Sequence, residues 1–233
     1  MLSGTMAAAF RTTRWTLIHL LRDADATRRR EAQDALYRTY RGPVLAYLRK
    51  KGVGAEAAEE LAQSFYVKVV LGRQLFERAD RSRGRLRALL CESLANYRKD
   101  DARRGRARRR LQAAVSPGGM AREQLEMIER SRNPDEAFDR SWAMGIVQRC
   151  VDKAQSHYLR IGREHTWRAF EERRFLPAAN NCRPPAPAAL AIELGFDSAA
   201  DLNAAVQTVQ KRLNLLIREE TGDDYDHFRT LMG

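Results

Sequence analysis

Apolar residues recur along most of this chain at the three- and four-residue spacing of an α-helix. The clearest case is the run Ala58, Leu61, Ala62, Phe65 and Val69, which forms one face of a helix. No segment has the two-residue alternation that is typical of a half-buried strand. The pattern therefore predicts an all-α protein. Its main helices are expected over residues 12–21, 27–41, 44–51, 58–69, 86–97, 134–158, 188–194 and 199–220.

One long segment of the chain, residues 111–133, lacks a clear helical pattern. Between residues 111 and 133 the apolar spacing loosens, and the segment contains the helix-breaking run Ser116-Pro117-Gly118-Gly119. A short helix is expected near residues 125–128. We therefore predict two helical domains joined by a linker. The expected division is a first domain at residues 10–110, a linker at 111–133, a second domain at 134–220 and an acidic tail at 221–233.

Positive charge is concentrated in the first half of the chain. The 233 residues include 42 Lys and Arg against 30 Asp and Glu, a net charge of +12. Residues 1–110 hold 26 of the basic and 12 of the acidic residues, so their net charge is +14 and that of the remainder is −2. Residues 81–110 are especially rich in arginine, whose planar guanidinium binds phosphate through two hydrogen bonds. This segment predicts a polyanionic partner. Nucleic acid is favoured over an acidic lipid surface and over a purely solubilising role.

Other classes of protein lack support in the sequence. No stretch approaches the roughly 18 consecutive apolar residues of a membrane span, and the first residues do not have the pattern of a signal peptide. Cys91, Cys150 and Cys182 are odd in number and far apart, which argues against a disulfide framework and favours a reducing cytoplasm. Phosphate-binding glycine loops and zinc-ligand spacings are also missing. We therefore expect a cytoplasmic protein that binds no metal or cofactor.

The last third of the chain has the order of elements of a helix-turn-helix. A short apolar helix is expected before Gly195-Phe196-Asp197, and a long helix after Ser198. The long helix is rich in amides, which pair with adenine through two hydrogen bonds. The candidate DNA contacts on it are Asn203, Gln207, Thr208, Gln210, Lys211 and Arg212.

Three segments resemble the bacterial RNA polymerase sigma factors of the extracytoplasmic-function (ECF) type. Residues 58–65, AEELAQSF, are similar to the family's polymerase-docking pattern A-E-D-L-x-Q-E-x-F. Residues 83–90, RGRLRALL, resemble the opening R-G-x-F-R-x-x-L of its promoter-binding helix, and residues 10–15, FRTTRW, are similar to the N-terminus of a divergent subgroup. The resemblance extends over roughly residues 10–220 and is more specific in the first half.

The resemblance implies a factor, not an enzyme, that binds core RNA polymerase through the β′ clamp helices and the β flap. It also implies promoter DNA as a partner, and the family often binds an anti-sigma protein. The residues that match the polymerase-docking motif are Glu59, Glu60, Leu61, Gln63 and Phe65. For Leu61 and Phe65 a core position is the alternative, and it is favoured for Phe65.

The resemblance also assigns contacts to the −10 and −35 promoter elements. Residues 75–83 match the loop that holds a flipped −10 base. The −10 candidates are Phe76, Arg83, Arg85, Arg87, Asn96, Lys99, Arg103 and Arg104. Phe76 and Tyr97 are candidates for stacking, with core positions as the alternative. The −35 contacts would come from the six residues of the final helix, which is acidic and amide-rich where the family usually has several basic residues.

Two other functions are compatible with parts of the sequence. A stand-alone helix-turn-helix regulator would not bind polymerase, and it would have little use for the acidic face at residues 56–63. An enzyme would need a paired acid and base. The candidates are Glu59 with Glu60, or His165 with nearby carboxylates. Adjacent glutamates point about 100° apart on a helix, so Glu59 and Glu60 do not form such a pair. The sigma-factor interpretation is therefore favoured over both.

Overall fold

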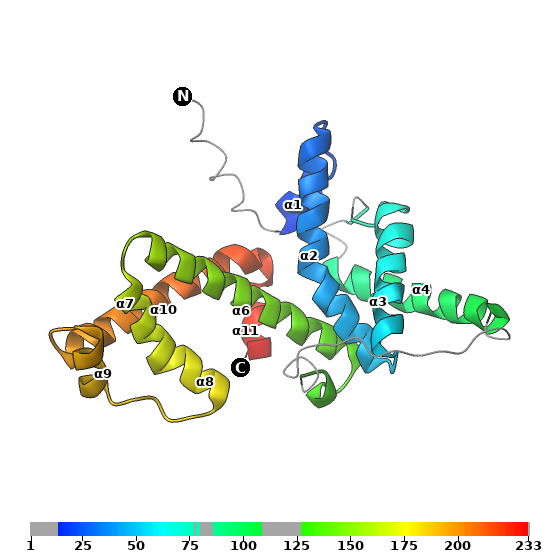
Figure 1. Ribbon diagram of the computed structural model, residues 1–233. Helices are drawn as coiled ribbons and strands as arrows, with labels where there is room; N and C mark the ends of the chain where they lie inside the picture. The colour runs from blue at the N-terminus through cyan, green and yellow to red at the C-terminus, as the bar shows by residue number, and fades with distance from the viewer. Residues whose placement is uncertain (1–13, 77, 80–85, 109–126, 233) are drawn as a thin grey trace. The chain divides into compact units, whose positions relative to one another are not determined.

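The structure is a computed structural model that describes residues 14–76, 78–79, 86–108 and 127–232. Every regular element in these ranges is helical (Figure 1), which confirms the predicted all-α class for the described chain. The chain divides into two compact units. Unit 1 contains the described residues up to Gly145 and those from Asp226 onward, and unit 2 is Ile146–Tyr225.

Unit 1 is built on one long helix, α2, which packs against three others. These elements are α1 (Arg14–Leu20), α2 (Ala26–Lys50), α3 (Ala55–Phe65) and α4 (Leu86–Arg108). Asp25 begins α2 by accepting a 2.8 Å hydrogen bond from the N–H of Thr27. Two helices were expected here, over residues 27–41 and 44–51, but the structure has one continuous helix that includes Gly42 and Pro43. Leu36, Tyr40, Val44 and Leu48 are fully buried at four-residue spacing, so one apolar stripe runs along the whole helix.

Helix α3 continues into a π-helical segment and then into a turn, and these lead the chain toward α4. Its predicted apolar face is buried at Ala58, Ala62 and Phe65, and the helix passes into a π-helical segment, η1 (Tyr66–Leu71). Gln74 then adopts a left-handed backbone conformation, with φ 50°, and turns the chain. Leu75, which is largely buried, follows this turn. In Figure 1, α2 and α3 lie side by side and the chain continues from α3 toward α4.

Helix α6 (Pro134–Arg160) is common to both units by sequence. Asn133 caps it, since its Oδ1 accepts a 2.9 Å hydrogen bond from the N–H of Glu136. The line of apolar residues predicted for this helix is buried throughout, at Phe138, Trp142, Ile146, Cys150, Ala154 and Tyr158. The helix therefore continues across the division between the two units, because nothing in this stripe interrupts it.

Residues 221–233 were expected to form an acidic tail, but most of them are helical. After the end of α10 at Thr221 come η4 (Gly222–Asp224) and α11 (Tyr225–Met232). Phe228 of α11 is buried, and its ring centroid lies 6.3 Å from that of Trp142 in an edge-on arrangement. A second small element, a helical turn at residues 127–130, packs Ile128 against Ala46 and Ala137. It lies close to the short helix expected near residues 125–128.

Unit 2 contains the predicted short helix, turn and long helix. Its elements after α6 are α7 (Glu164–Phe170), η3 (Glu171–Phe175), α8 (Leu176–Asn180), α9 (Pro187–Leu194) and α10 (Ala199–Thr221). Gly195 ends α9 with φ 74°, and the N–H of Phe196 donates a 2.9 Å hydrogen bond to the carbonyl of Ala191. Ser198 then caps α10 by accepting from the N–H of Asp201 at 3.1 Å. One face of α10 packs on α7 and α9.

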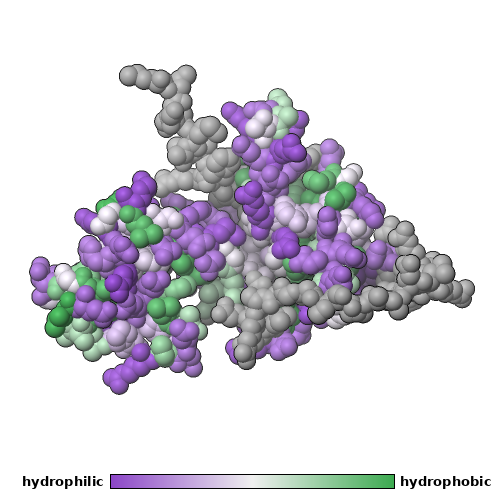
Figure 2. All heavy atoms as spheres, viewed as in Figure 1, coloured by the Kyte–Doolittle hydropathy of each residue, from purple (hydrophilic) through white to green (hydrophobic). Residues whose placement is uncertain are grey.

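The surface of the molecule is mainly hydrophilic on the face shown in Figure 2. Hydrophobic side chains reach solvent at separate positions, among them Ile192 on α9, which is 83% exposed. Among the described helices, none has the length and apolarity that crossing a lipid bilayer requires.

Candidate nucleic-acid interface

The polar side chains predicted on α3 form an exposed face of unit 1. Glu59, Glu60 and Gln63 are exposed, whereas Leu61 is only partly exposed. Phe65 is completely buried and its ring lies 5.8 Å from that of Tyr97, so it belongs to the core and is not available for docking. Glu59 is not isolated on this face: its Oε2 accepts a 2.7 Å hydrogen bond from Arg41 of α2.

The predicted −10 residues on α4 fall into two groups. Asn96 and Lys99 are exposed. Arg87, in contrast, is turned toward α6, where its Nε lies 3.1 Å from Oδ1 of Asp139. Their side chains are 12% and 18% exposed, so this ion pair is mostly shielded from solvent. Burial raises the pKa of the Asp139 carboxyl, and the positive charge of Arg87 opposes that rise. Arg87 therefore joins α4 to α6 within unit 1 and does not contribute to the exposed face.

Of the five other −10 candidates, one is a core residue, and the side chains of the other four lie outside the part of the chain that the structure describes. Phe76 is 3% exposed and lies against Tyr40, with ring centroids 6.0 Å apart, so the core alternative applies to it. Tyr97 is likewise 5% exposed. Arg83 and Arg85 lie outside the described residues. Arg103 and Arg104 belong to the last turns of α4, and their side chains lie outside the described part.

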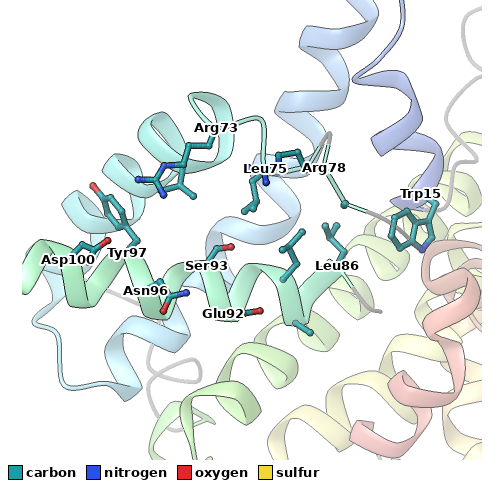
Figure 3. Close-up of a pocket in the computed structure, with 14 residues that line it drawn as sticks. Trp15, Arg73, Leu75, Arg78, Leu86, Glu92, Ser93, Asn96, Tyr97 and Asp100 are labelled. Carbon is teal, nitrogen blue, oxygen red and sulfur yellow. The ribbon is translucent and has the colours of Figure 1, made fainter. Parts of the chain in front are cut away.

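A groove of about 560 Å³ runs along α4 in unit 1. Figure 3 shows α4 on one side of it and the segment that follows η1 on the other, with Trp15 of α1 at one end and Asp100 at the other. The described residues that line it are Trp15, Val69, Arg73, Leu75, Arg78, Ala79, Leu86, Ala88, Leu89, Glu92, Ser93, Asn96, Tyr97 and Asp100. The groove therefore adjoins the described part of the predicted base-holding loop, residues 75–83.

The walls of this groove differ in chemistry. Arg73 and Arg78, both exposed, supply positive charge from the segment after η1. Ser93 and Asn96 are three residues apart on α4 and therefore share a face, where they offer hydrogen-bonding groups of both kinds. Leucine and alanine side chains add apolar surface, and Glu92 and Asp100 of α4 add negative charge. Apolar surface and hydrogen-bonding groups suit the base of an unpaired nucleotide, and the arginines on the wall opposite α4 suit its phosphate.

The sequence indicated Asn96 and Tyr97 and placed Leu75, Arg78 and Ala79 in the base-holding loop, but it assigned no such role to Ser93, Arg73 or Trp15. Ser93 shares the helical face of Asn96, so periodicity alone was sufficient to find it. Arg73 and Trp15 lie outside both this loop and α4, and their approach to the groove depends on the turn at Gln74 and on the packing of α1.

The candidate DNA contacts on α10 are mostly exposed on the surface of unit 2. Asn203, Gln207 and Gln210 follow each other at four- and three-residue spacing, so they lie along one side of the helix. Thr208 and Lys211 are also exposed, while Arg212 is partly buried. Gln210 Nε2 donates a 3.2 Å hydrogen bond to Asn214 on the next turn. The helix thus presents amides to solvent and few charges.

Neither unit brings metal-ligating side chains together within the ranges described. No three His, Cys, Asp or Glu side chains there lie close enough to hold one ion. Cys150 is buried and Cys91 is partly buried, and burial raises the pKa of both thiols, that of Cys150 to about 11. Their arrangement does not fit a reactive thiolate, which needs a lowered pKa and access to solvent.

Comparisons with known proteins add nothing to these observations on the site. No protein-family model, no curated protein and no solved structure matches the chain.

Proposed function

We propose that this chain is a sigma-type transcription initiation factor, which binds core RNA polymerase and directs it to promoter DNA. The observation that carries the proposal is the groove along α4, which combines Arg73 and Arg78 with the hydrogen-bonding groups of Ser93 and Asn96. Such a groove suits an unpaired base and its phosphate better than it suits a duplex, whose bases are stacked inside. A factor that helps to open the −10 element needs this kind of site.

The exposed face of α3 supports the second half of the proposal. Glu59, Glu60 and Gln63 form an acidic and amide surface that complements a basic, polar partner. This face and the groove belong to the same compact unit, which supports the proposal that one module both docks on polymerase and opens the promoter. This agrees with the resemblance of residues 58–65 and 83–90 to the sigma-factor motifs.

The charge of unit 2 favours this function over that of a stand-alone DNA-binding regulator. Its residues include 11 Lys and Arg and 11 Asp and Glu, so its net charge is zero. A regulator that relied on its helix-turn-helix would need phosphate contacts there, because neutralisation of phosphates supplies most of the non-specific affinity for DNA. The excess of positive charge lies instead in residues 1–110.

Transcription with purified core RNA polymerase tests the proposal. A library of promoter fragments is transcribed with and without the protein, and we expect start sites that depend on it. Glu59→Arg/Glu60→Arg should abolish these starts by reversing the charge of the docking face. Asn96→Ala/Lys99→Ala should reduce them while polymerase binding persists. Glu31→Arg, a charge reversal at an exposed site on α2, is the matched control and should leave initiation unchanged.

Binding to polymerase core is measured separately by co-purification, so that docking and promoter opening are distinguished. Binding of the wild-type protein to DNA without any protein-dependent start site would contradict the proposal and leave the stand-alone regulator as the better interpretation.

A further inference from the structure

Trp15 lies at one end of the groove. It is the last residue of the segment FRTTRW, which resembles a sigma-factor N-terminus but to which the resemblance assigns no promoter contact. We propose that Trp15 is a stacking platform for an unpaired DNA base, so that α1 extends the single-strand binding site beyond α4. This inference rests on the proposed function, and it names a contact that the resemblance does not assign.

Trp15 differs from the other two tryptophans of the chain in its exposure. Trp142 and Trp167 are 1% and 2% exposed and belong to the core. Trp15 is only partly buried, and its side chain borders the groove together with Leu86 and Leu89. A large aromatic ring that is partly open to solvent at the edge of a groove is suited to stacking on a base.

The position of Trp15 is determined by the packing of α1 on α2. Ile18 and Leu21 are 2% and 4% exposed, so α1 is anchored by its apolar side. Hydrogen bonds also fix the segment that connects α1 to α2: Nη1 of Arg29 donates to the carbonyls of Asp23 and Ala24 at 2.7 and 2.9 Å. The tryptophan is therefore presented by a fixed element, which reduces the entropy lost when it stacks on a base.

The charges around the groove indicate how a DNA strand would lie in it. Arg73 and Arg78 are on the wall opposite α4, whereas Glu92 and Asp100 are on α4 itself. Phosphates are attracted to the first wall and repelled by the second, so the bases face α4 and the strand follows the helix. From Leu86 to Asp100 the helix extends for about 20 Å, which is long enough to accept more than one base.

Tryptophan fluorescence tests the proposal directly, because the two other tryptophans are buried. The full-length protein is titrated with short single-stranded oligo(dA) and oligo(dT), and binding is followed by the anisotropy of a dye on the DNA. We expect bound DNA to protect Trp15 from quenching by acrylamide. The contribution of Trp15 is the difference between the wild type and Trp15→Phe. Because phenylalanine keeps an aromatic ring at this position, the Trp15→Phe variant removes the fluorescence of Trp15 and still allows stacking.

Variants provide the second test. Trp15→Ala should weaken binding roughly 5- to 100-fold, the effect of losing one stacked base, while Trp15→Phe should retain most of the affinity. His19→Ala, on the exposed side of the same helix, is the matched control and should bind as the wild type does. Circular dichroism verifies that each variant is folded.

Several results would overturn the proposal. One is a wild-type protein that does not bind these oligonucleotides. Another is saturating DNA that leaves Trp15 as accessible to acrylamide as before, and a third is unchanged binding by Trp15→Ala. The transcription assay separates this inference from the proposed function. If the wild type and Trp15→Ala initiate equally well, the role of Trp15 is refuted but the sigma-factor assignment is not. If DNA protects Trp15 but no initiation occurs, only the sigma-factor assignment is refuted.

Discussion

Asp139 and His227 join the last helix of the chain to α6, with Oδ2 of the carboxylate 3.2 Å from Nε2 of the imidazole. The other carboxylate oxygen of Asp139 contacts Arg87, so a single acidic side chain connects α4, α6 and α11 within unit 1. Each of these side chains is less than one fifth exposed. An interaction of this kind is costly to break on one side, because the remaining charge stays in a largely buried place.

Arg87→Ala should therefore reduce the stability of unit 1. We expect the free energy of unfolding to fall by about 2 kcal/mol, as for the loss of a shielded, charge-assisted hydrogen bond. Urea denaturation followed by circular dichroism measures this change. Lys99→Ala, on the exposed side of the same helix, is expected to leave stability unchanged and to weaken DNA binding. An Arg87→Ala protein that unfolds at the wild-type urea concentration but loses DNA binding would contradict the structural role of Arg87.

The stability of unit 2 should depend on pH through Glu220. Burial raises the pKa of its carboxyl, but Lys153 and Arg149, at 2.9 and 3.1 Å, more than compensate and hold the pKa below its ordinary value. A carboxyl with a lowered pKa binds fewer protons when folded than when unfolded. Its contribution is therefore complete above about pH 4.3, the ordinary value for glutamate, and is lost as the pH falls through the lower, folded value.

Glu220→Gln is the variant that tests this dependence. It should lower the free energy of unfolding at neutral pH by roughly 1 kcal/mol, and it should lose less stability than the wild type on acidification. Thermal unfolding measured from neutral to acidic pH gives both values. Asp197→Asn, at an exposed carboxylate in the turn of the same unit, serves as the control. Parallel pH curves for the wild type and Glu220→Gln would show that Glu220 is not the group responsible.

The three cysteines should react with thiol reagents at very different rates. Cys182 is exposed, whereas Cys150 is buried and Cys91 is partly buried. The thiolate is the reactive form, and burial raises the pKa of Cys91 and Cys150, which leaves both mainly as thiols. Brief treatment of the native protein with iodoacetamide should therefore label Cys182 first, as mass spectrometry of the peptides would reveal. Labelling of all three at one rate in the native protein, as expected after denaturation, would contradict the burial of Cys150 and the partial burial of Cys91.

Replacement of glycine by alanine should have opposite effects at two positions. Gly195 has φ 74°, so alanine is strained there although no atom lies within 4 Å of the added Cβ. We expect Gly195→Ala to cost about 1 kcal/mol. Gly42 lies inside α2, and a Cβ there would make an ordinary 3.5 Å contact with Ser141. Gly42→Ala should stabilise the protein by roughly 0.5–1 kcal/mol, since alanine is the better helix former. Thermal melts of the two variants provide the comparison, and equal shifts in the same direction would refute it.

The helices with a single clean apolar face were the most predictable part of the fold. In α3 and α6 the buried positions follow the helical period without interruption, so the sequence identifies both the helix and its inner face. Pro43 was harder to interpret. It removes one backbone hydrogen bond, but the proline ring is buried in the stripe of α2, and this packing is a tertiary effect that local sequence rules do not include.

The candidate site was predictable only where its residues lie on one helix. The exposure of Glu59, Glu60 and Gln63 follows from their position opposite the buried face of α3. Arg87 also lies between the buried positions of α4, but its partner Asp139 is distant in sequence, and no local pattern indicates their pairing. The groove depends on a turn at Gln74, where a left-handed conformation occurs without the glycine that usually marks it.

The assignment of Asp226 and the residues after it to unit 1 has a consequence for the synthesis of the protein. Ribosomes make the chain from its N-terminus, and domains generally fold as units in that order. Unit 1 cannot follow this order completely, because Phe228 and His227 are added only after all of Ile146–Tyr225 has been made. Until then Trp142 lacks the aromatic side chain that packs on it in the finished protein. Unit 2, which is continuous in sequence, can complete its folding before unit 1 does, although most of unit 1 leaves the ribosome first.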